Sequence, residues 1–238
     1  MSGIRRFFVD SIHEGMKLEG EEFAHACSVL RLKAGDEIIL LDNSGKEYGA
    51  IIAKVNKRDM DLTVTGESIG DKESKTDVCL IVGLLKGDKT ELVVQKATEL
   101  GVKEIKIFTS KYVSAYVNDN KLERLEKVAK EAAKQCLRSV APAVEYFPTL
   151  EEALKSAKDY ENKLFACEFA QESEVELKDI SGSTAVVVGS EGGFAKEEFE
   201  MAKELGYKGI TLGKRILRAE TAAITMVSLV TFILGDLS

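Results

Sequence analysis

The fold of this chain is decided by the stretches Val-Val-Val-Gly-Ser-Glu-Gly-Gly-Phe at residues 186–194 and Leu-Gly-Lys-Arg-Ile-Leu-Arg-Ala-Glu-Thr-Ala-Ala at residues 212–223. In each stretch an apolar strand runs into a glycine turn, and the turn leads into a predicted helix. Charged residues stand within or after the glycines: Glu191, Arg215, Arg218 and Glu220. The edge at which parallel strands end is where open α/β sheets bind small ligands. The two loops therefore predict a cofactor site.

The composition is that of a globular protein with 45% hydrophobic and 7% aromatic residues. Its 238 residues suit one large domain or two modest ones. No apolar run approaches the about 20 residues that a membrane span requires, and the N-terminus lacks a signal-peptide pattern. The cysteines, Cys27, Cys79, Cys136 and Cys167, are far apart. Scattered thiols predict reduced cysteines in a cytoplasmic protein, and the lack of a Cys/His cluster predicts no metal site. The lack of a long apolar run predicts no membrane contact.

The charge distribution bears on nucleic-acid binding. The net charge of −7 argues against a protein that coats DNA, but RNA contact depends on a local patch. Residues 86–138 contain 12 Lys and Arg against 8 Asp and Glu, a local excess of four positive charges. A solvated helical face of mixed charge would give the same count.

Residues 1–70 have the pattern of a small β-rich domain. Strands are expected at 37–42, 48–55 and 61–66, with a short helix at 21–29, and together they predict a compact barrel. The polar segment 69–76 is the expected linker. We therefore predict two domains, 1–70 and 71–238.

Beyond the linker, strands and helices alternate. Strands are expected at 78–85, 104–109, 143–147, 163–167, 185–188 and 209–212, and helices at 89–100, 121–139, 150–157, 196–205 and 217–234. This alternation predicts an α/β fold with a parallel sheet and helices on both faces.

The glycine loops do not match the known pyrophosphate motifs. The dinucleotide pattern G-x-G-x-x-G belongs after the first strand, which here ends Gly83-Leu-Leu-Lys-Gly, and no G-x-x-x-x-G-K-[ST] occurs. Gly192 and Gly193 instead let a ligand approach the backbone closely. The apolar side chains of Leu212, Ile216 and Leu217 would sandwich a flat base. A purely structural turn before a helix is the alternative for the first loop taken alone.

Taken together, the two stretches resemble motifs of the SPOUT methyltransferases, and nearly the whole chain resembles the RsmE family of 16S ribosomal RNA uracil-N3 methyltransferases. The resemblance extends through Arg5–Val9, His25, Val29–Asp36, Leu85–Lys89, Gln95–Val102, Glu131–Cys136 and the two C-terminal loops. This chain departs from the family pattern at Ser190, where proline is usual, at Leu137, where glycine is usual, and at Ala195, where Ser or Thr often caps the next helix.

The resemblance implies a fold, a cofactor and a substrate. It implies a PUA-like RNA-binding barrel followed by a SPOUT domain with a C-terminal trefoil knot. The implied activity is S-adenosylmethionine-dependent methylation of uridine N3 in 16S rRNA of the 30S subunit. The cofactor would contact Cys167, Gly189, Glu191, Gly192, Gly193, Leu212, Gly213, Ile216, Leu217, Arg218 and Thr221.

Catalysis and RNA contact are assigned by the same resemblance. Glu191 or Glu220 would take the N3 proton, and Arg138 or Arg218 would stabilise the uridine anion. An Arg218–Glu220 ion pair that fixes the helix start is the alternative for those two residues. RNA contacts are expected from Arg5, Arg6, His25, Arg31, Lys33, Lys86, Lys96, Gln135 and Arg138. His25 has a structural role as its alternative, and Lys96 lies beside the 89–100 helix face of Glu91, Gln95 and Glu99, which would equally be solvated.

The implied assembly is a homodimer through the knotted region, with the apolar helix 222–234 at the interface. That helix would fit a monomer core equally well. A ribose 2′-O-methyltransferase of the same superfamily, a non-catalytic RNA-binding ribosome assembly factor and a nicotinamide enzyme are the competing functions.

Overall fold

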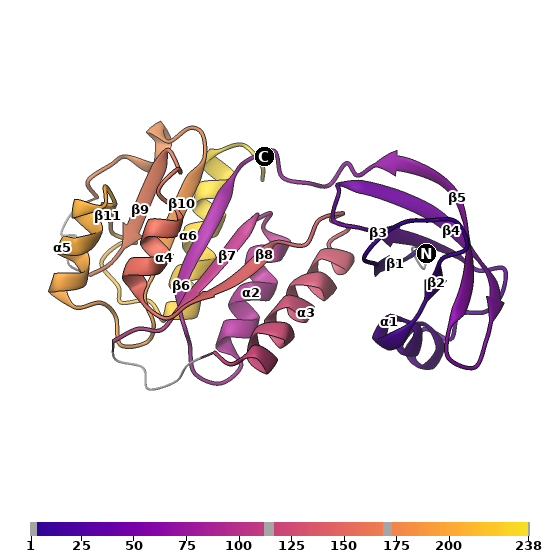
Figure 1. Cartoon of the computed structure of the whole chain (residues 1–238). Helices are drawn as coiled ribbons and strands as arrows, with labels where there is room; N and C mark the ends of the chain where they lie inside the picture. The colour runs from indigo at the N-terminus through magenta and orange to yellow at the C-terminus, as the bar shows by residue number, and fades with distance from the viewer. Residues whose placement is uncertain (1–3, 112–116, 169–172, 238) are drawn as a thin grey trace. The chain divides into compact units, whose positions relative to one another are not determined.

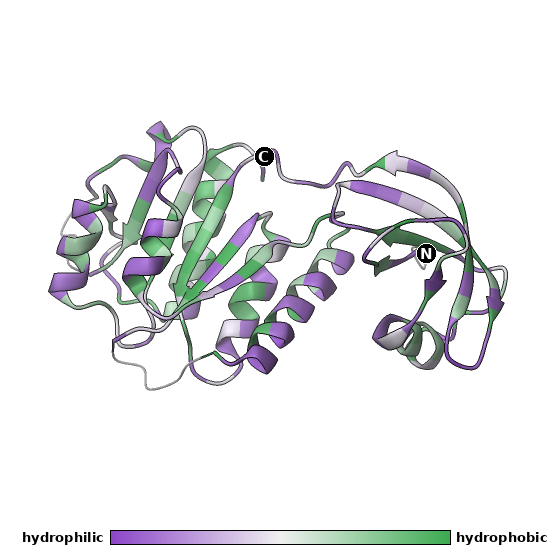
Figure 2. Ribbon diagram, viewed as in Figure 1, coloured by the Kyte–Doolittle hydropathy of each residue, from purple (hydrophilic) through white to green (hydrophobic). Residues whose placement is uncertain are grey.

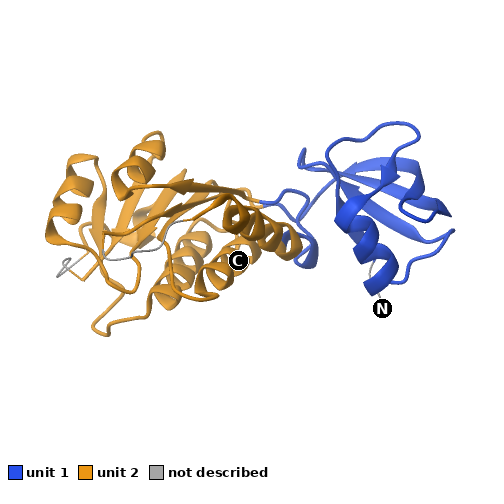
Figure 3. Ribbon diagram, turned by 60° about the horizontal axis from the view of Figure 1, so that its bottom comes forward, with its two compact units in different colours: residues 1–73, 133–141 blue, residues 74–132, 142–238 orange. Residues whose placement is uncertain are grey.

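The computed structural model describes residues 4–111, 117–168 and 173–237 and divides the chain into two compact units. Unit 1 comprises residues 1–73 and 133–141, and unit 2 comprises residues 74–132 and 142–238 (Figure 3). Nothing in the sequence indicates that residues 133–141 group with the N-terminal part. No helix in the described ranges is long and apolar enough to cross a membrane.

Unit 1 is built on a five-stranded sheet (Figure 1). Its strands are β1 (Arg5–Phe8), β2 (Lys17–Leu18), β3 (Glu37–Leu41), β4 (Lys46–Val55) and β5 (Met60–Ile69), in the order β1-β3-β4-β5-β2. β1 runs parallel to β3 and the other pairs are antiparallel. Phe7, Leu40, Ile52 and Met60 are fully buried in its core. The predicted strands and turn after β3 are confirmed, whereas the short strands β1 and β2 were not predicted.

The predicted 21–29 helix is composite. It begins as α1 (Gly20–Ala24) and continues as the π-helical turn η1 (His25–Val29). The Leu30 amide donates to the His25 carbonyl at 3.1 Å, and Arg31 then adopts a left-handed conformation with φ 55°. This chain reversal ends the helix and turns Arg31 toward solvent.

Unit 2 has a six-stranded, fully parallel sheet. Its strands are β6 (Val78–Gly83), β7 (Glu104–Phe108), β8 (Ala143–Phe147), β9 (Asn162–Ala166), β10 (Thr184–Val188) and β11 (Lys208–Ile210), in the order β11-β9-β10-β6-β7-β8. All residues of β6 and β10 are buried, as expected of strands that are covered on both faces. Figure 2 shows β6 in the green of hydrophobic residues. The predicted parallel α/β architecture is confirmed.

The helices cover both faces of this sheet. One core contains Val94 of α2 (Lys89–Glu99), Leu125 of α3 (Asp119–Gln135) and Met226 of α6 (Ala219–Ile233). The other contains Leu154 of α4 (Leu150–Ser156) and Phe199 of α5 (Lys196–Glu204). A short 3-10 turn, η2 (Leu177–Asp179), precedes β10.

Two predicted helix boundaries are wrong. The predicted 121–139 helix ends at Gln135, because Leu137 has a φ of 66° and a right-handed helix cannot pass through it. The predicted 217–234 helix begins at Ala219, since Arg218 is still extended with ψ 151°. Both ends lie beside residues that were assigned to the functional site.

The connections that leave β6 and β10 create a switch point in this sheet. These strands are neighbours, with Val82 paired to Val188. The chain leaves β6 for α2 on one face and leaves β10 for α5 on the other face. A crevice opens where adjacent parallel strands send their connections to opposite faces, and such crevices bind ligands. The knot expected from the family resemblance stays a prediction.

Candidate functional site

The turn after β10 packs directly against the end of β6. Ser190 and Gly193 form an isolated antiparallel bridge, in which the Gly193 amide donates to the Ser190 carbonyl at 3.0 Å. A Cβ at Gly83 would lie 2.6 Å from the Ser190 amide nitrogen, closer than real Cβ atoms approach. Glycine at residue 83 is therefore what lets the two strand ends meet.

Two further glycines admit close neighbours to this turn. A Cβ at Gly189 would lie 3.1 Å from the ring of Phe194. Gly193 has a φ of 66°, and a Cβ there would lie 2.7 Å from Oε1 of Glu168, which follows β9. The turn thus combines a left-handed backbone with close packing, and only glycine meets both conditions.

The helix after this turn begins without a side-chain cap from Ala195, as the sequence predicts. Glu198 compensates, because its Oε2 accepts a hydrogen bond from the Ala195 amide at 2.7 Å. This is the returning half of a capping box.

A single lysine joins the two glutamates that were assigned to chemistry. Lys89 Nζ lies 3.5 Å from Glu191 Oε1 and 3.4 Å from Glu220 Oε1. Lys89 begins α2 after β6, Glu191 follows β10, and Glu220 lies in the first turn of α6. The Glu191–Lys89–Glu220 cluster therefore brings together three segments that are far apart in sequence.

Glu191 is held as a carboxylate. Burial opposes its ionisation, but the backbone amides of Lys86 and Glu191 and the ammonium of Lys89 outweigh burial and lower its pKa below the ordinary 4.5. The Lys86 amide donates to Glu191 Oε1 at 3.0 Å. These donors make Glu191 an anchor of the turn.

Glu220 keeps one oxygen uncommitted. Its Oε2 is buried without a hydrogen-bond partner among the described residues, although the side chain as a whole retains 13% exposure. Its ion pair is with Lys89, so the predicted alternative of an Arg218–Glu220 pair is wrong. Arg218 is exposed at the N-cap of α6.

The loop that follows β11 is the second predicted segment of the cofactor site. Leu212 and Leu217 are half-buried, and Leu212 packs against the core that contains α6. Gly213 is exposed with φ 94°, and a Cβ there would meet nothing within 4 Å. Ile216 is 97% exposed. The structure therefore places the predicted apolar contact of Ile216 in solvent.

The remaining predicted contacts in unit 2 are distributed around the same strand ends. Cys167 is buried directly after β9, and its amide donates to the Ile210 carbonyl at 3.3 Å. Thr221 is exposed on α6. Because β6, β10, β9 and β11 are successive neighbours in the sheet, their following loops lie along one edge.

The α2 face that was expected to be either a groove or solvated is occupied by ion pairs. Lys96 Nζ lies 2.8 Å from Glu99 Oε1, and Glu91 Oε2 lies 2.9 Å from Arg124 Nη2. Lys86 is exposed, and its backbone rather than its side chain contacts Glu191.

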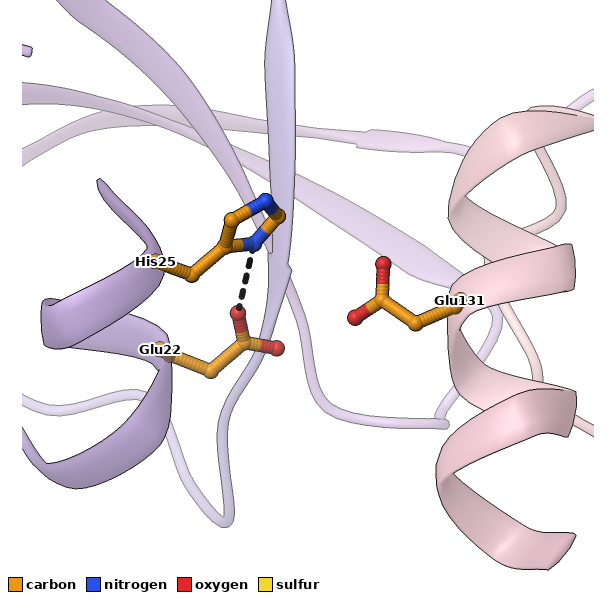
Figure 4. A group of neighbouring side chains, drawn as sticks. All are labelled: Glu22, His25 and Glu131. Carbon is orange, nitrogen blue, oxygen red and sulfur yellow. Dashed lines mark ion pairs between the residues drawn. The ribbon is translucent and has the colours of Figure 1, made fainter. Parts of the chain in front are cut away.

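The predicted RNA contacts of unit 1 fall into two groups. Arg5, Arg31 and Lys33 are exposed. Arg6 instead pairs with Glu47, with Nη2 2.6 Å from Oε1, and its side chain is only 7% exposed. His25 Nδ1 lies 4.0 Å from Glu22 Oε2 (Figure 4), and its ring meets Phe7 edge-on. Glu131, also drawn there, belongs to unit 2.

Arg138 is engaged inside unit 1. Its Nε and Nη2 lie 3.2 and 3.1 Å from Glu73 Oε2, and the residue is 3% exposed. Glu73 Oε1 also accepts the amides of Ser139 and Val140. These are the contacts of an arginine that fixes a chain turn. Gln135 is exposed at the end of α3.

Models of known protein families match both the N-terminal part and the larger C-terminal part of the chain. Residues 72–231 match the model of an RNA methyltransferase domain, and residues 18–65 match an RNA methyltransferase PUA domain. Ribosomal RNA small subunit methyltransferase E of Rickettsia conorii is 34% identical, with 94% of this chain and 93% of the relative covered. The enzyme of the same name from Mesomycoplasma hyopneumoniae is 38% identical over 67% of this chain and 71% of its own length.

The chain belongs to the RsmE family of RNA methyltransferases. The RsmE of Neisseria gonorrhoeae, solved with S-adenosyl methionine bound, superposes with a TM-score of 0.87 at 28% identity, covering 99% of this chain and all of its own. The predicted family and the PUA-like first domain are confirmed.

Two site residues of this RsmE chain were missed by sequence reasoning. Lys89 lay in a quoted segment but received no role, and Glu168 was not considered. The sequence signal for Lys89 was its position shortly after the first strand of the parallel sheet. That position points to Glu191 only once the strand order is known, because the order puts β6 beside β10.

Proposed function

We propose that this protein methylates N3 of a uridine in 16S rRNA of the small subunit, with S-adenosylmethionine as methyl donor. Family membership and the relatives' names support rRNA of the small subunit as the substrate. The observation that carries the proposal is the Glu191–Lys89–Glu220 cluster beside the glycine turn at the switch point. A cytoplasmic location follows from a ribosomal substrate.

The residues at this sheet edge suit such a donor. Close packing at Gly83, Gly189 and Gly193 fixes the backbone of the turn at the end of β10, next to the end of β6. When bound, S-adenosylmethionine supplies a methyl group that its sulfonium already activates. We propose that it is held by the backbone of residues 189–193 and 212–213 and by Cys167, Leu217 and Thr221.

Uridine N3 carries a proton at neutral pH, and methylation requires that proton to leave. We propose that Glu220 accepts it, because its Oε2 has no hydrogen-bond partner among the described residues and its side chain retains 13% exposure. The ion pair with Lys89 holds the Glu220 side chain in place. Glu191 already accepts two donors and serves as the anchor of Lys89 and of the turn. Arg218, exposed at the N-cap of α6 two residues before Glu220, supplies the cation that stabilises the uridine anion.

The first domain would bind the rRNA. Arg5, Arg31 and Lys33 are the exposed cations for phosphate contacts, whereas Arg6, His25 and Arg138 support the domain through their partners. Lys86, Lys96 and Gln135 stay secondary candidates. The expected outcome of replacing Arg31 and Lys33 by Gln is weaker RNA binding with unchanged cofactor affinity.

The proposed assembly is a homodimer through the C-terminal region, with the family's trefoil knot around α6. Its support is an apolar surface, since Leu229 and Phe232 of α6 and Leu92 of α2 are 37%, 59% and 40% exposed, and α2 packs on α6. Analytical ultracentrifugation should show a dimer at assay concentrations, and a fully active monomer would contradict this part.

The test incubates the protein with methyl-labelled S-adenosylmethionine and either 16S RNA or 30S subunits, then identifies the product nucleoside by mass spectrometry. N3-methyluridine is expected. A ribose-methylated nucleoside would overturn the N3 assignment, and no cofactor binding in calorimetry would leave an RNA-binding assembly factor as the function.

A further inference from the structure

The loop between β11 and α6 exposes an uncompensated group of positive charges. Lys214, Arg215 and Arg218 are all exposed, and no carboxylate within the described ranges pairs with any of them. Residues 208–218 contain four cations, at 208, 214, 215 and 218, and no acid, in a chain whose net charge is −7. The cluster therefore stands out as a local positive site on an acidic protein.

Three lysines on other helices of unit 2 are paired instead. Lys155 pairs with Glu151 on α4, Lys203 with Glu200 on α5 and Lys96 with Glu99 on α2. These three lysines satisfy their charge within the protein. The cations of the 213–218 loop have no such ion pair among the described residues and can therefore bind an anionic partner.

An apolar side chain lies within the same loop. Ile216 is 97% exposed between the cations, so it contacts almost nothing in the chain. A surface that combines cations with an apolar tip suits single-stranded nucleic acid, whose phosphates take the charges and whose bases offer apolar faces.

We infer that Lys214 and Arg215 bind RNA phosphates next to the target uridine and that the Ile216 side chain packs against a neighbouring base. This inference rests on the proposed function for the identity of the partner. The loop follows β11, and its last residue caps α6 two residues before Glu220, so RNA bound there would pass beside the proposed base. The backbone of Leu212 and Gly213 stays free to contact the cofactor.

The experiment compares the full-length Lys214→Gln/Arg215→Gln variant with the wild type. RNA affinity is measured by fluorescence anisotropy with a single-stranded 16S rRNA fragment that contains the methylated site, between 50 and 200 mM salt. Each lost phosphate contact should lower the slope of log K against log salt by about 0.7, so the double variant should lose about 1.4. Affinity for S-adenosylmethionine in calorimetry should be unchanged.

The matched control is Lys155→Gln/Lys158→Gln, which removes the same charge from exposed positions on and just after α4. It should leave the salt slope at the wild-type value. Ile216→Ala should weaken RNA binding about three- to tenfold at an unchanged salt slope, because the lost contact is apolar.

Three outcomes would overturn the inference. The first is a salt slope equal to that of the control. The second is a loss of cofactor affinity with RNA binding intact, which would make the loop a cofactor anchor. The third is a shift to monomer in sedimentation, which would make it a dimer contact. Failure of the proposed function looks different, because RNA would then bind with the full slope while no methyl group is transferred.

Discussion

The two glycine loops that looked alike in sequence differ in what holds them. The 189–193 turn is packed and anchored: Ser190 lies against Gly83, and Glu191 is fixed by the Lys86 amide and by Lys89. The 213–218 loop is open, since Gly213 has no neighbour within 4 Å of an added Cβ and Ile216 is almost fully exposed.

This difference indicates a division of roles along one sheet edge. A packed turn presents its backbone in one fixed geometry, which suits a small ligand that must be positioned closely. An open loop with unpaired cations suits a large anionic partner that arrives from solvent.

The largest effect is expected at Glu220. Glu220→Gln removes the proposed proton acceptor but keeps the shape of the side chain, so kcat should fall about 10²- to 10⁴-fold. Cofactor affinity should change by less than threefold, about 0.6 kcal/mol of binding free energy, because Glu220 acts on the uridine proton and not on the cofactor. Glu197→Gln, exposed on α5, is the control. Unchanged kcat in Glu220→Gln would assign the proton to another group.

Gly83 supports the packed turn and Gly213 lies in the open loop, so the two should respond differently to replacement by alanine. Gly83→Ala forces a Cβ to within 2.6 Å of backbone and should lower the free energy of unfolding by about 1–3 kcal/mol. Gly213→Ala meets no atom, so its cost should be only the roughly 1 kcal/mol of a left-handed alanine. Urea unfolding measures both, and equal losses would contradict the contrast.

Acidification should weaken the anchoring of the turn by Glu191. The pKa of Glu191 is lowered in the fold, so its stabilising contacts are complete above its ordinary pKa of 4.5 and are lost as the pH falls through the lower folded value. The difference in unfolding free energy between wild type and Glu191→Gln should therefore shrink on acidification below 4.5. A difference that is independent of pH would show that Glu191 does not anchor the turn electrostatically.

The smallest effect is expected at Ser190. Its Oγ is buried without a hydrogen-bond partner among the described residues. Ser190→Ala removes this unsatisfied hydroxyl and should raise the free energy of unfolding by about 1 kcal/mol. A loss of stability of that size would mean that the hydroxyl has a partner, and the cofactor affinity of the variant would show whether the turn had moved.

Much of the architecture was predictable because it depends on local pattern. Continuous apolar runs such as Val186–Val188 and the alternation of strands and helices identified the parallel sheet. Strand order depends on contacts distant in sequence, and so the Glu191–Lys89–Glu220 cluster could not be foreseen. Arg6 and Arg138 were assigned to RNA because their charge is visible in sequence, whereas their partners Glu47 and Glu73 are not.

Leu137 shows how a departure from a family pattern becomes physical. The resemblance puts glycine at this position, and the structure gives the residue a φ of 66°. A leucine in the left-handed region costs about 1–2 kcal/mol relative to the right-handed one. The sequence prediction continued the helix past this residue because leucine, unlike glycine, does not indicate a helix end.

The claim that the packed turn positions the cofactor while the cations of the open loop bind RNA is tested most directly by calorimetric titration of S-adenosylmethionine. The wild type and the Lys214→Gln/Arg215→Gln variant should bind it with equal affinity, and Gly83→Ala should bind it at least about tenfold more weakly, a difference of about 1.4 kcal/mol. Loss of affinity in the loop variant with full affinity in Gly83→Ala would contradict the account.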